Sequence, residues 1–252
     1  MEERLHTSLI IPMYNESAIL QNTLDRVCAY MKEAFPDGYE IIFVDDGSTD
    51  NSAEIVEKYG DEATRVLRSD RNYGKGHAVR EGMLAARGRY IVFTDCDLAY
   101  GTAVIGRTVG FLSAYPRYGA VIGSRDAHPQ GYAGYSLLRR IVSRAYRAVL
   151  RIGFGLRLSD SQSGIKGFTA EAVEKIFPLC CVNRYAFDFE AIAIGERRGV
   201  RFGEMPVRVI ENKGGRIRLV RDSIRMLRDL AFVRRRLKEI PRACPAEKIT
   251  KV

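Results

Sequence analysis

The segment YIVFTDCD at residues 90–97 constrains the fold of this chain more than any other. Its apolar part predicts a buried strand that delivers two carboxylates, one residue apart, to the carboxyl end of that strand. Because side chains alternate along a strand, Asp95 and Asp97 should point the same way and Cys96 the opposite way. Two like charges this close repel unless a cation lies between them or one of them is protonated. A divalent metal that bridges a diphosphate is the common solution, since carboxylate and phosphate oxygens share Mg²⁺ or Mn²⁺.

Two earlier segments repeat this arrangement. Residues 8–11 run into the polar turn PMYNE, and residues 40–44 run into DDGSTD. Each turn is followed by a helical pattern. Apolar strands that alternate with helices predict βαβ units, and hence an α/β fold with a mostly parallel central sheet flanked by helices.

Parallel strands in such units bring their carboxyl ends to one edge of the sheet, where ligands bind. The acids that follow the three strands should therefore converge on one rim: Glu16, Asp45, Asp46, Asp95 and Asp97. Turn formation and helix capping are the alternative roles of such residues. We favour these roles for Asp50 and Ser52, and a ligand site for the set as a whole.

A glycine-rich loop, RNYGKGH at residues 71–77, precedes a helical stretch over residues 78–86. Two glycines that flank Lys75 would let the backbone approach an anion, and Lys75 and the helix N-terminus would supply positive potential. The spacing of an ATP-binding P-loop is absent. A flexible turn is the alternative interpretation of this loop.

The charge of the chain points to an anionic partner. The 252 residues carry a formal net charge of +9, and residues 134–158 and 213–238 hold most of the excess Arg and Lys. Nucleic acid, phospholipid headgroups and a phosphorylated substrate all fit such a distribution. The five cysteines are an odd number without zinc-ligand spacing, which predicts reduced thiols in a cytoplasmic setting. No apolar run is long enough to span a bilayer, and no signal peptide is recognisable at the N-terminus.

Two basic segments in the second half have amphipathic patterns. Residues 136–152 combine an apolar stripe with arginines at every third or fourth position and contain no acid. This pattern favours a helix that lies in a membrane interface. Residues 221–240 repeat the theme, and there we weigh membrane contact equally against an ordinary helix whose apolar stripe packs on the protein.

Seven motifs together resemble the inverting family 2 glycosyltransferases with the GT-A fold. These are PMYNE (12–16), VDDGSTD (44–50), NYGKG (72–76), DCD (95–97), GSR (123–125), DSQSGIKGF (160–168) and AFDFE (186–190). The chain is most similar to the branch that makes polyprenyl-phosphate sugars, dolichyl-phosphate β-glucosyltransferases above all, over roughly residues 8–235. Ser163 and Ile165 replace a cysteine and a phenylalanine that are frequent in that branch.

The resemblance implies one GT-A domain over residues 1–240, followed by a tail over 241–252. Residues 8–125 would bind the nucleotide sugar, and residues 126–240 would bind the acceptor and carry the basic amphipathic helices. Pro12, Tyr14, Glu16, Asp45, Asp46 and Lys75 would hold the base and ribose. Asp95 would contact the ribose or sugar end, and Asp97, with Asp95, would bind Mg²⁺ or Mn²⁺ on the diphosphate.

On the acceptor side, the resemblance assigns the lipid phosphate to Arg125 and Arg139, in a pocket that Gln162, Ser163 and Lys166 also line. Arginine suits this task because its planar fork grips phosphate oxygens in pairs. Asp188 matches the general base of relatives that glycosylate hydroxyls, and Asp160 is the second choice. A phosphomonoester is already ionised near neutral pH and can attack without a base.

The expected function is transfer of a hexose, glucose from UDP-glucose first of all, to a polyprenyl phosphate of the dolichyl or undecaprenyl type. The enzyme would be attached peripherally at the cytoplasmic face of the membrane. One alternative is a glycosyltransferase that uses mannose or GlcNAc, or that modifies a hydroxyl of a polysaccharide or protein. Another is a basic nucleic-acid-binding protein, but this reading leaves the acidic rim unexplained.

Overall fold

A computed structural model of the chain describes residues 5–131, 160, 162–184, 186–210 and 219–242, with the backbone alone for 219–227. The basic segment predicted as a helix at 136–152, which includes Arg139, lies outside these residues, as does the tail from residue 243. Within the described part, no helix is both long and apolar enough to cross a membrane.

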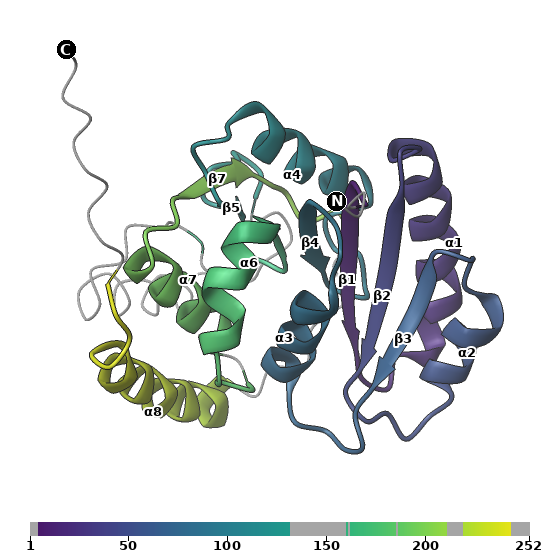
Figure 1. Ribbon diagram of the computed structural model, residues 1–252. Coiled ribbons are helices and arrows are strands. Elements are labelled where there is room, and N and C mark those ends of the chain that lie inside the picture. The colour runs from purple at the N-terminus through teal and green to yellow at the C-terminus, as the bar shows by residue number, and fades with distance from the viewer. Residues whose placement is uncertain (1–4, 132–159, 161, 185, 211–218, 243–252) are drawn as a thin grey trace, which may run out of the picture.

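Strands and helices alternate strictly in the first half (Figure 1). The elements are β1 (Thr7–Met13), α1 (Ser17–Ala34), β2 (Tyr39–Asp45), α2 (Ser52–Tyr59), β3 (Thr64–Arg68), α3 (Lys75–Ala85) and β4 (Tyr90–Thr94). The predicted strands at 8–11, 40–44 and 90–94 are β1, β2 and β4, and the three predicted helical patterns are α1, α2 and α3. β3 was not predicted.

The second half adds strands that come from distant parts of the chain. The elements are α4 (Ala103–Ala114), β5 (Ala120–Ser124), β6 (Ile165–Thr169), α6 (Ala170–Ile176), the 3₁₀ helix η1 (Phe177–Leu179), α7 (Phe187–Arg197), β7 (Phe202–Pro206) and α8 (Leu219–Leu237). The described strands form one sheet in the order β3-β2-β1-β4-β6-β5-β7. β6 runs antiparallel to β4 and β5, and the other neighbours are parallel. The prediction of a mostly parallel sheet is therefore confirmed.

The register brings the strand ends of the first half to one level. Ile10 of β1 lies opposite Ile42 of β2 and Phe93 of β4. Because the three strands are parallel and in step, their carboxyl ends finish side by side, at Met13, Asp45 and Thr94. This alignment is what gathers the polar turns that follow each strand at one edge of the sheet.

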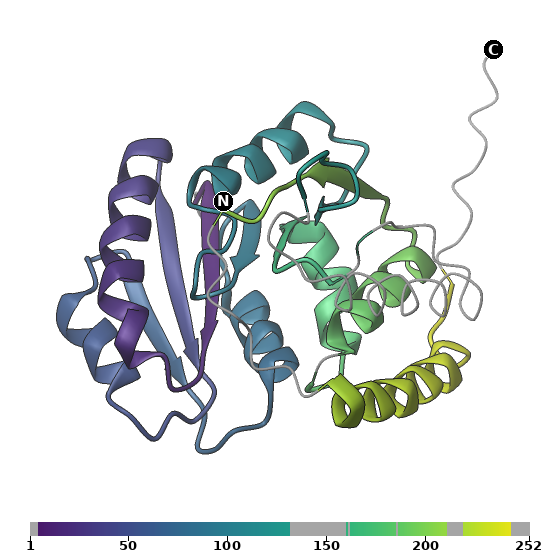
Figure 2. The ribbon, with the colours of Figure 1, turned by 180° about the vertical axis from the view of Figure 1, so that it is seen from behind.

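Both faces of the sheet are covered, which explains why its strands are continuous apolar runs. Leu9 and Phe43 point into a core shared with α1, α2 and α4, and Ile10 and Phe93 point into a second core shared with α3, α6 and α7. Figure 1 shows α3 and α6 in front of the sheet, and Figure 2, the view from behind, shows α1 on the opposite face. A third cluster joins α7 to α8 through Phe189, among others.

Candidate active site

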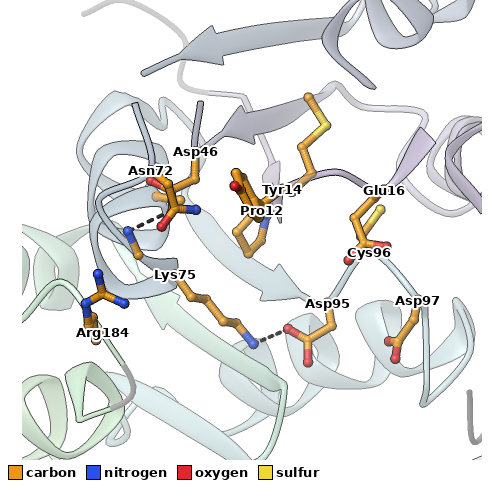
Figure 3. Close-up of a pocket in the computed structure, with 13 residues that line it drawn as sticks. Pro12, Tyr14, Glu16, Asp46, Asn72, Lys75, Asp95, Cys96, Asp97 and Arg184 are labelled. Carbon is orange, nitrogen blue, oxygen red and sulfur yellow. Dashed lines mark hydrogen bonds and ion pairs between the residues drawn. The ribbon is translucent and has the colours of Figure 1, made fainter. Parts of the chain in front are cut away.

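A cavity of about 450 Å³ opens at the aligned strand ends. Its lining residues come from the end of β1 and the turn after it, the turns after β2 and β4, the loop between β3 and α3, the start of α3 and one position before α7. They are Pro12, Met13, Tyr14, Glu16, Asp46, Asn72, Gly74, Lys75, Ala78, Asp95, Cys96, Asp97 and Arg184 (Figure 3). The volume is in the usual range for a small-molecule site. Four of these side chains are acids and two are cations, so the lining has the acidic character predicted for the rim.

The turns after β1 and β2 hold each other in place. The Asn15 carboxamide oxygen accepts the Thr49 N–H at 2.8 Å, and the Glu16 N–H donates to the Ser52 hydroxyl at 2.9 Å. Asn15 has a positive φ of 54°, a conformation that Asn tolerates better than most residues. These hydrogen bonds between the two turns fix the backbone that presents Tyr14 and Glu16 to the cavity.

Asp50 and Ser52 are turn residues, as predicted. The Asp50 carboxylate accepts the Ser17 N–H at 3.2 Å, where α1 begins, and the Ser52 N–H at 3.0 Å, where α2 begins. Asp45 has a similar task, because its carboxylate accepts the Ser48 N–H at 3.0 Å. Asp45 and Asp46 are both buried, but only Asp46 lines the cavity.

Asp46 organises the glycine-rich loop. Its two carboxylate oxygens accept the N–H groups of Tyr73 at 3.0 Å and Gly74 at 2.7 Å. Burial raises the pKa of Asp46, although these two hydrogen bonds oppose the shift. The residue thus ties the turn after β2 to the start of α3.

The two glycines of this loop are required by protein packing. A side chain at Gly74 would meet the Asn183 carbonyl oxygen at 2.4 Å, and one at Gly76 would meet the Val182 carbonyl oxygen at 2.4 Å. The Gly76 N–H donates to the Asn183 carbonyl at 2.8 Å. The N–H groups of Gly76, His77 and Ala78, in the first turn of α3, therefore have protein acceptors. Lys75, in contrast, extends into the cavity as predicted (Figure 3).

Asp95 and Asp97 lie just beyond β4, not within it. The strand ends at Thr94, and the Leu98 N–H closes a turn on the Asp95 carbonyl at 3.0 Å. The strand-alternation argument therefore used the wrong local structure. All three residues line the cavity, but Figure 3 shows the Asp95 and Asp97 side chains directed the same way and Cys96 directed away from them. The Cys96 side chain is 4% exposed and packs in the core.

Asp95 is held by two neighbours. The Lys75 ammonium donates to its Oδ1 atom, and a side chain at position 164 would come within 2.2 Å of its Oδ2 atom, so only glycine fits there. Burial would lower the pKa of Lys75, but the charges of Asp95 and Asp188 outweigh burial and raise it. Lys75 is therefore a permanent cation at the centre of the cavity.

The residues present fit a divalent cation whose ligands come partly from the protein and partly from a bound substrate. Among the described residues there is no group of three His, Cys, Asp or Glu side chains that could hold a metal alone. Mg²⁺ bound to a nucleotide commonly uses one or two protein carboxylates and completes its shell with phosphate oxygens and water. Asp97 and Asp95 offer that number of hard oxygen ligands on one side of the cavity (Figure 3).

A buried ion pair lies next to this cavity. The Lys166 ammonium, on β6, is 2.6 Å from Asp188 Oδ1 and 2.7 Å from the Ser163 carbonyl oxygen. Burial raises the pKa of Asp188, and the charges of Lys166 and Lys75 reduce that shift. The side chain of Lys166 is only 2% exposed, and its ammonium also lies over the Phe93 ring, 5.2 Å from the centroid.

Asp160 is in a different electrostatic environment. Arg125 grips it with three donors: its backbone N–H at 3.0 Å, Nε at 2.6 Å and Nη2 at 2.7 Å. Burial would raise the pKa of Asp160, but the hydrogen bonds and charge of Arg125 outweigh burial and lower it. A carboxylate held this firmly in its ionised form is a weak base.

Most residues predicted to bind the sugar nucleotide line the cavity, whereas the described residues predicted for the sugar acceptor do not. The lining includes Pro12, Tyr14, Glu16, Asp46, Lys75, Asp95 and Asp97. It does not include Asp45, Arg125, Gln162, Ser163, Lys166 or Asp188. Arg184 and Asn72 line it although neither was predicted as a site residue. Asn72 lay within a quoted motif, whereas nothing in the local pattern around Arg184 distinguished it from other basic residues.

Comparison with known proteins gives one family. Residues 8–177 match the family model described as Glycosyl transferase family 2. The dolichyl-phosphate beta-glucosyltransferase of Saccharomyces cerevisiae is 31% identical, over 92% of this chain and 75% of that protein. The human protein of the same name is 30% identical, over 91% of this chain and 75% of that protein.

Solved structures agree in fold. Glucosyl-3-phosphoglycerate synthase from Mycobacterium tuberculosis, in complex with Mn²⁺, UDP-glucose and phosphoglyceric acid, is similar with a TM-score of 0.68 at 21% identity, over 94% of this chain and 81% of that chain. A mannosyltransferase from Pyrobaculum calidifontis, in complex with GDP-mannose and Mn²⁺, has a TM-score of 0.65 at 22% identity, over 97% of this chain and 67% of that chain. The predicted GT-A architecture is thereby confirmed.

Proposed function

Because this chain belongs to glycosyl transferase family 2, we propose that it transfers glucose from UDP-glucose to a polyprenyl phosphate, with inversion at the anomeric carbon. The names of the yeast and human relatives support glucose as the sugar and a polyprenyl phosphate as the acceptor. The Mycobacterium tuberculosis neighbour, solved with UDP-glucose and Mn²⁺, supports the donor and the metal.

The observation that carries the proposal is the cavity at the ends of β1, β2 and β4. Asp95 and Asp97 lie on one side of it, and the Lys75 side chain reaches toward Asp95 from the glycine-rich loop. A bare nucleotide diphosphate would be repelled by four carboxylates against two cations. A divalent cation inverts this local field and makes the same lining attractive to a diphosphate.

The residues predicted to bind the sugar nucleotide then have separate roles. Asp97, assisted by Asp95, holds the metal, which when bound neutralises the charge that builds up on the leaving UDP. Lys75 pairs with the Asp95 carboxylate and holds it in place. Pro12, Tyr14, Glu16 and Asp46 contact the base and ribose. Asp45 acts indirectly, through the Ser48 turn that supports this wall.

On the acceptor side, Arg125, Arg139, Gln162, Ser163 and Lys166 remain our predicted contacts of the lipid phosphate. Lys166 has a further role in this proposal, because its ammonium keeps the Asp188 carboxylate in place beside the donor cavity. The attacking phosphate oxygen needs no base. Asp188 therefore orients the acceptor, and its raised pKa makes it a better proton acceptor than Asp160.

We further propose that the enzyme is held at the cytoplasmic face of the membrane by basic surface residues, α8 among them. Arg228, Arg234, Arg235 and Lys238 of the C-terminal part of α8 and its continuation are exposed, and so is Phe232, at 49%. Exposed cations attract anionic headgroups, and an exposed aromatic ring inserts among them.

The test is an assay with polyprenyl phosphate in detergent, UDP-glucose and Mn²⁺. We expect a lipid-linked glucose as the product, and loss of more than about 10²-fold in turnover in Asp97→Ala, since one ligand of the metal is removed. The matched control is Asp37→Ala, which removes an exposed carboxylate in the turn before β2 and should leave turnover unchanged. Full activity in the presence of EDTA would refute the metal assignment.

A hydroxyl acceptor on a polysaccharide or protein is the second candidate, favoured by the raised pKa of Asp188, because a hydroxyl needs a base. The two candidates differ in the effect of Asp188→Asn. With a hydroxyl acceptor the loss should be about 10²–10⁴-fold, the usual contribution of a general base. A much smaller loss supports the phosphate acceptor.

A further inference from the structure

One wall of the donor cavity is built by a loop that the motifs did not predict. Residues 182–184 lie against the glycine-rich loop, where the Asn183 carbonyl accepts N–H groups of Gly76 at 2.8 Å and His77 at 3.2 Å. The side chain of Arg184 passes so close to Gly74 that an added Cβ there would meet its Cγ at 3.0 Å. Arg184 is thereby brought into the cavity lining from the second half of the chain.

Glu190 of α7 anchors this loop. Its Oε2 atom accepts the N–H groups of Cys181 at 2.9 Å and Val182 at 2.8 Å, and its side chain is 1% exposed. Its Oε1 atom receives the Arg236 guanidinium from α8 at 3.4 Å. A buried carboxylate with this many donors is a fixed point, and the loop that carries Arg184 starts directly from it.

Arg184 and Lys75 are the two cations among the described lining residues, and they occupy different parts of the cavity. Figure 3 shows the Lys75 side chain directed to Asp95, while Arg184 lies near Asn72 and Asp46, on the side away from Asp97. The guanidinium has an electrostatic interaction with Asp229 of α8, and no carboxylate within the described residues lies within ion-pair distance of it. Arg184 therefore lines the part of the cavity farther from the proposed metal ligand Asp97.

We propose that Arg184 is a donor-binding residue that donates hydrogen bonds to the nucleoside half of the sugar nucleotide, and that Glu190 positions it. A uracil ring presents two carbonyl acceptors beside one N–H donor, and this end of the cavity offers guanidinium donors beside the Asp46 carboxylate. Each Asp46 oxygen accepts one backbone N–H and retains a second lone pair. This inference rests on the proposed function, since it assumes a nucleotide donor.

Calorimetric titration of UDP and UMP, both in saturating Mn²⁺, tests the contact. Arg184→Ala should weaken both ligands by the same factor, about tenfold, as expected for one lost hydrogen bond to a charged group. The affinity of Arg184→Lys for both ligands should fall between those of Arg184→Ala and the wild type. Arg201→Ala, which removes an exposed arginine that does not line the cavity, is the matched control and should bind both ligands like the wild type.

Three outcomes would overturn the inference in different ways. Weaker binding of UDP with unchanged UMP would assign Arg184 to the β-phosphate. Unchanged binding of both ligands would exclude a donor contact while leaving the proposed function intact. A wild-type protein that binds no UDP in the presence of metal would refute the proposed function itself.

The positioning role of Glu190 is tested by a double-mutant cycle on UMP affinity. Glu190→Gln keeps a carbonyl oxygen for both N–H groups and should bind UMP within about twofold of the wild type, whereas Glu190→Asp, which is too short to reach both, should lose about tenfold. If Glu190 acts through Arg184, the Glu190→Asp loss should vanish in the Arg184→Ala background. An undiminished loss in that background would overturn the positioning role and leave Glu190 with a general structural one.

Discussion

Asp160 and Asp188 are two buried carboxylates whose environments separate their chemistry. Asp160 is 2% exposed and faces the fork of Arg125, whereas Asp188 is 8% exposed and faces the single ammonium of Lys166. The hydrogen bonds and charge of Arg125 lower the pKa of Asp160 by more than burial raises it. At Asp188 the effect of burial is the larger one, and the pKa is raised. This difference supports the proposed role of Asp188 at the acceptor and favours a structural role for Asp160.

The pH dependence of stability should report the Asp160–Arg125 pair. Because the pKa of Asp160 is lower in the folded chain than its ordinary 3.8, the unfolded chain binds more protons, and stability falls as pH decreases below that value. Asp160→Asn should reduce this acid-dependent loss. It should also lower the free energy of unfolding at pH 7 by about 3–5 kcal/mol, because a buried ion pair is broken.

Urea denaturation of both proteins between pH 3 and pH 7 provides the measurement. Glu171→Gln is the matched control, since its carboxylate pairs with Lys175 on the surface, where its side chain is 75% exposed, and such pairs contribute little. Identical pH profiles for the wild type and Asp160→Asn would contradict the assignment.

Gly164 sets the position of Asp95. A Cβ atom at this position would lie only 2.2 Å from Asp95 Oδ2, so Gly164→Ala should displace that carboxylate. We expect a loss of up to about 10² in kcat/KM for the donor, as displacements near 1 Å produce in other active sites. Steady-state kinetics with varied UDP-glucose would measure it.

Gly110→Ala is the matched control for this substitution. Gly110 lies within α4, and nothing within 4 Å would meet the added methyl group. The change should stabilise the helix by about 0.5–1 kcal/mol and leave the kinetics unaltered. Equal kinetic effects at both glycines would show that Asp95 is not the target.

At the scale of elements, α8 presents two unlike faces. Leu230 and Val233 are each 1% exposed and pack in the cluster that contains Phe189 and Ile192 of α7. This confirms protein packing for that part of the apolar stripe. The face available to a membrane is the outer one, which carries Phe232 among exposed arginines.

Two substitutions on α8 should separate folding from membrane contact. Leu230→Ala should lower the free energy of unfolding by about 2–5 kcal/mol, through the cavity that it leaves. Phe232→Ala should change stability by less than about 0.5 kcal/mol but weaken binding to anionic vesicles. Sedimentation with phosphatidylserine vesicles, at low and high salt, measures the second effect, and salt-insensitive binding would argue against an electrostatic contribution.

The elements that the sequence reveals are those built from local patterns. β1, β2 and β4 are apolar runs followed by turn residues, and each was recognised. β6 was not, because its residues, IKGFT, mix a lysine and a glycine into the strand. Lys166 tolerates burial there only because Asp188, 22 residues later, neutralises it, and Gly167 is needed because a side chain would meet Thr108 of α4 at 2.3 Å. Both reasons lie in distant parts of the chain.

The whole molecule keeps its opposite charges apart. The donor cavity is lined by Glu16, Asp46, Asp95 and Asp97, whereas arginines gather on α8, which lies on the side of the fold away from α1 and α2 (Figure 1). The same separation limits what a sequence can reveal about the site. Residues close to a motif, such as Lys75, could be predicted, but Arg184 enters the cavity only through the packing of two loops.

Ligand-induced stabilisation provides a global check of the donor site. UDP and Mn²⁺ together should raise the free energy of unfolding by about 2.7 kcal/mol at a ligand concentration of 100 Kd. Either component alone should raise it much less, because the carboxylates repel the diphosphate and the metal lacks its phosphate ligands. Thermal unfolding followed by circular dichroism tests this, and equal shifts with UDP alone would contradict the proposed sharing of the cation.

The place of β6 between β4 and β5 has a consequence for biosynthesis. β5 ends at Ser124 and β6 begins about 40 residues later, at Ile165, so the ribosome needs roughly 2–8 s to make the strand that joins them. During that interval β1 to β4 can already assemble, but the edge of β4 and the edge of β5 that pair with β6 lack their hydrogen-bonding partner. Nascent chains that have released β5 from the ribosome but not yet β6 should therefore be the species that chaperones capture best.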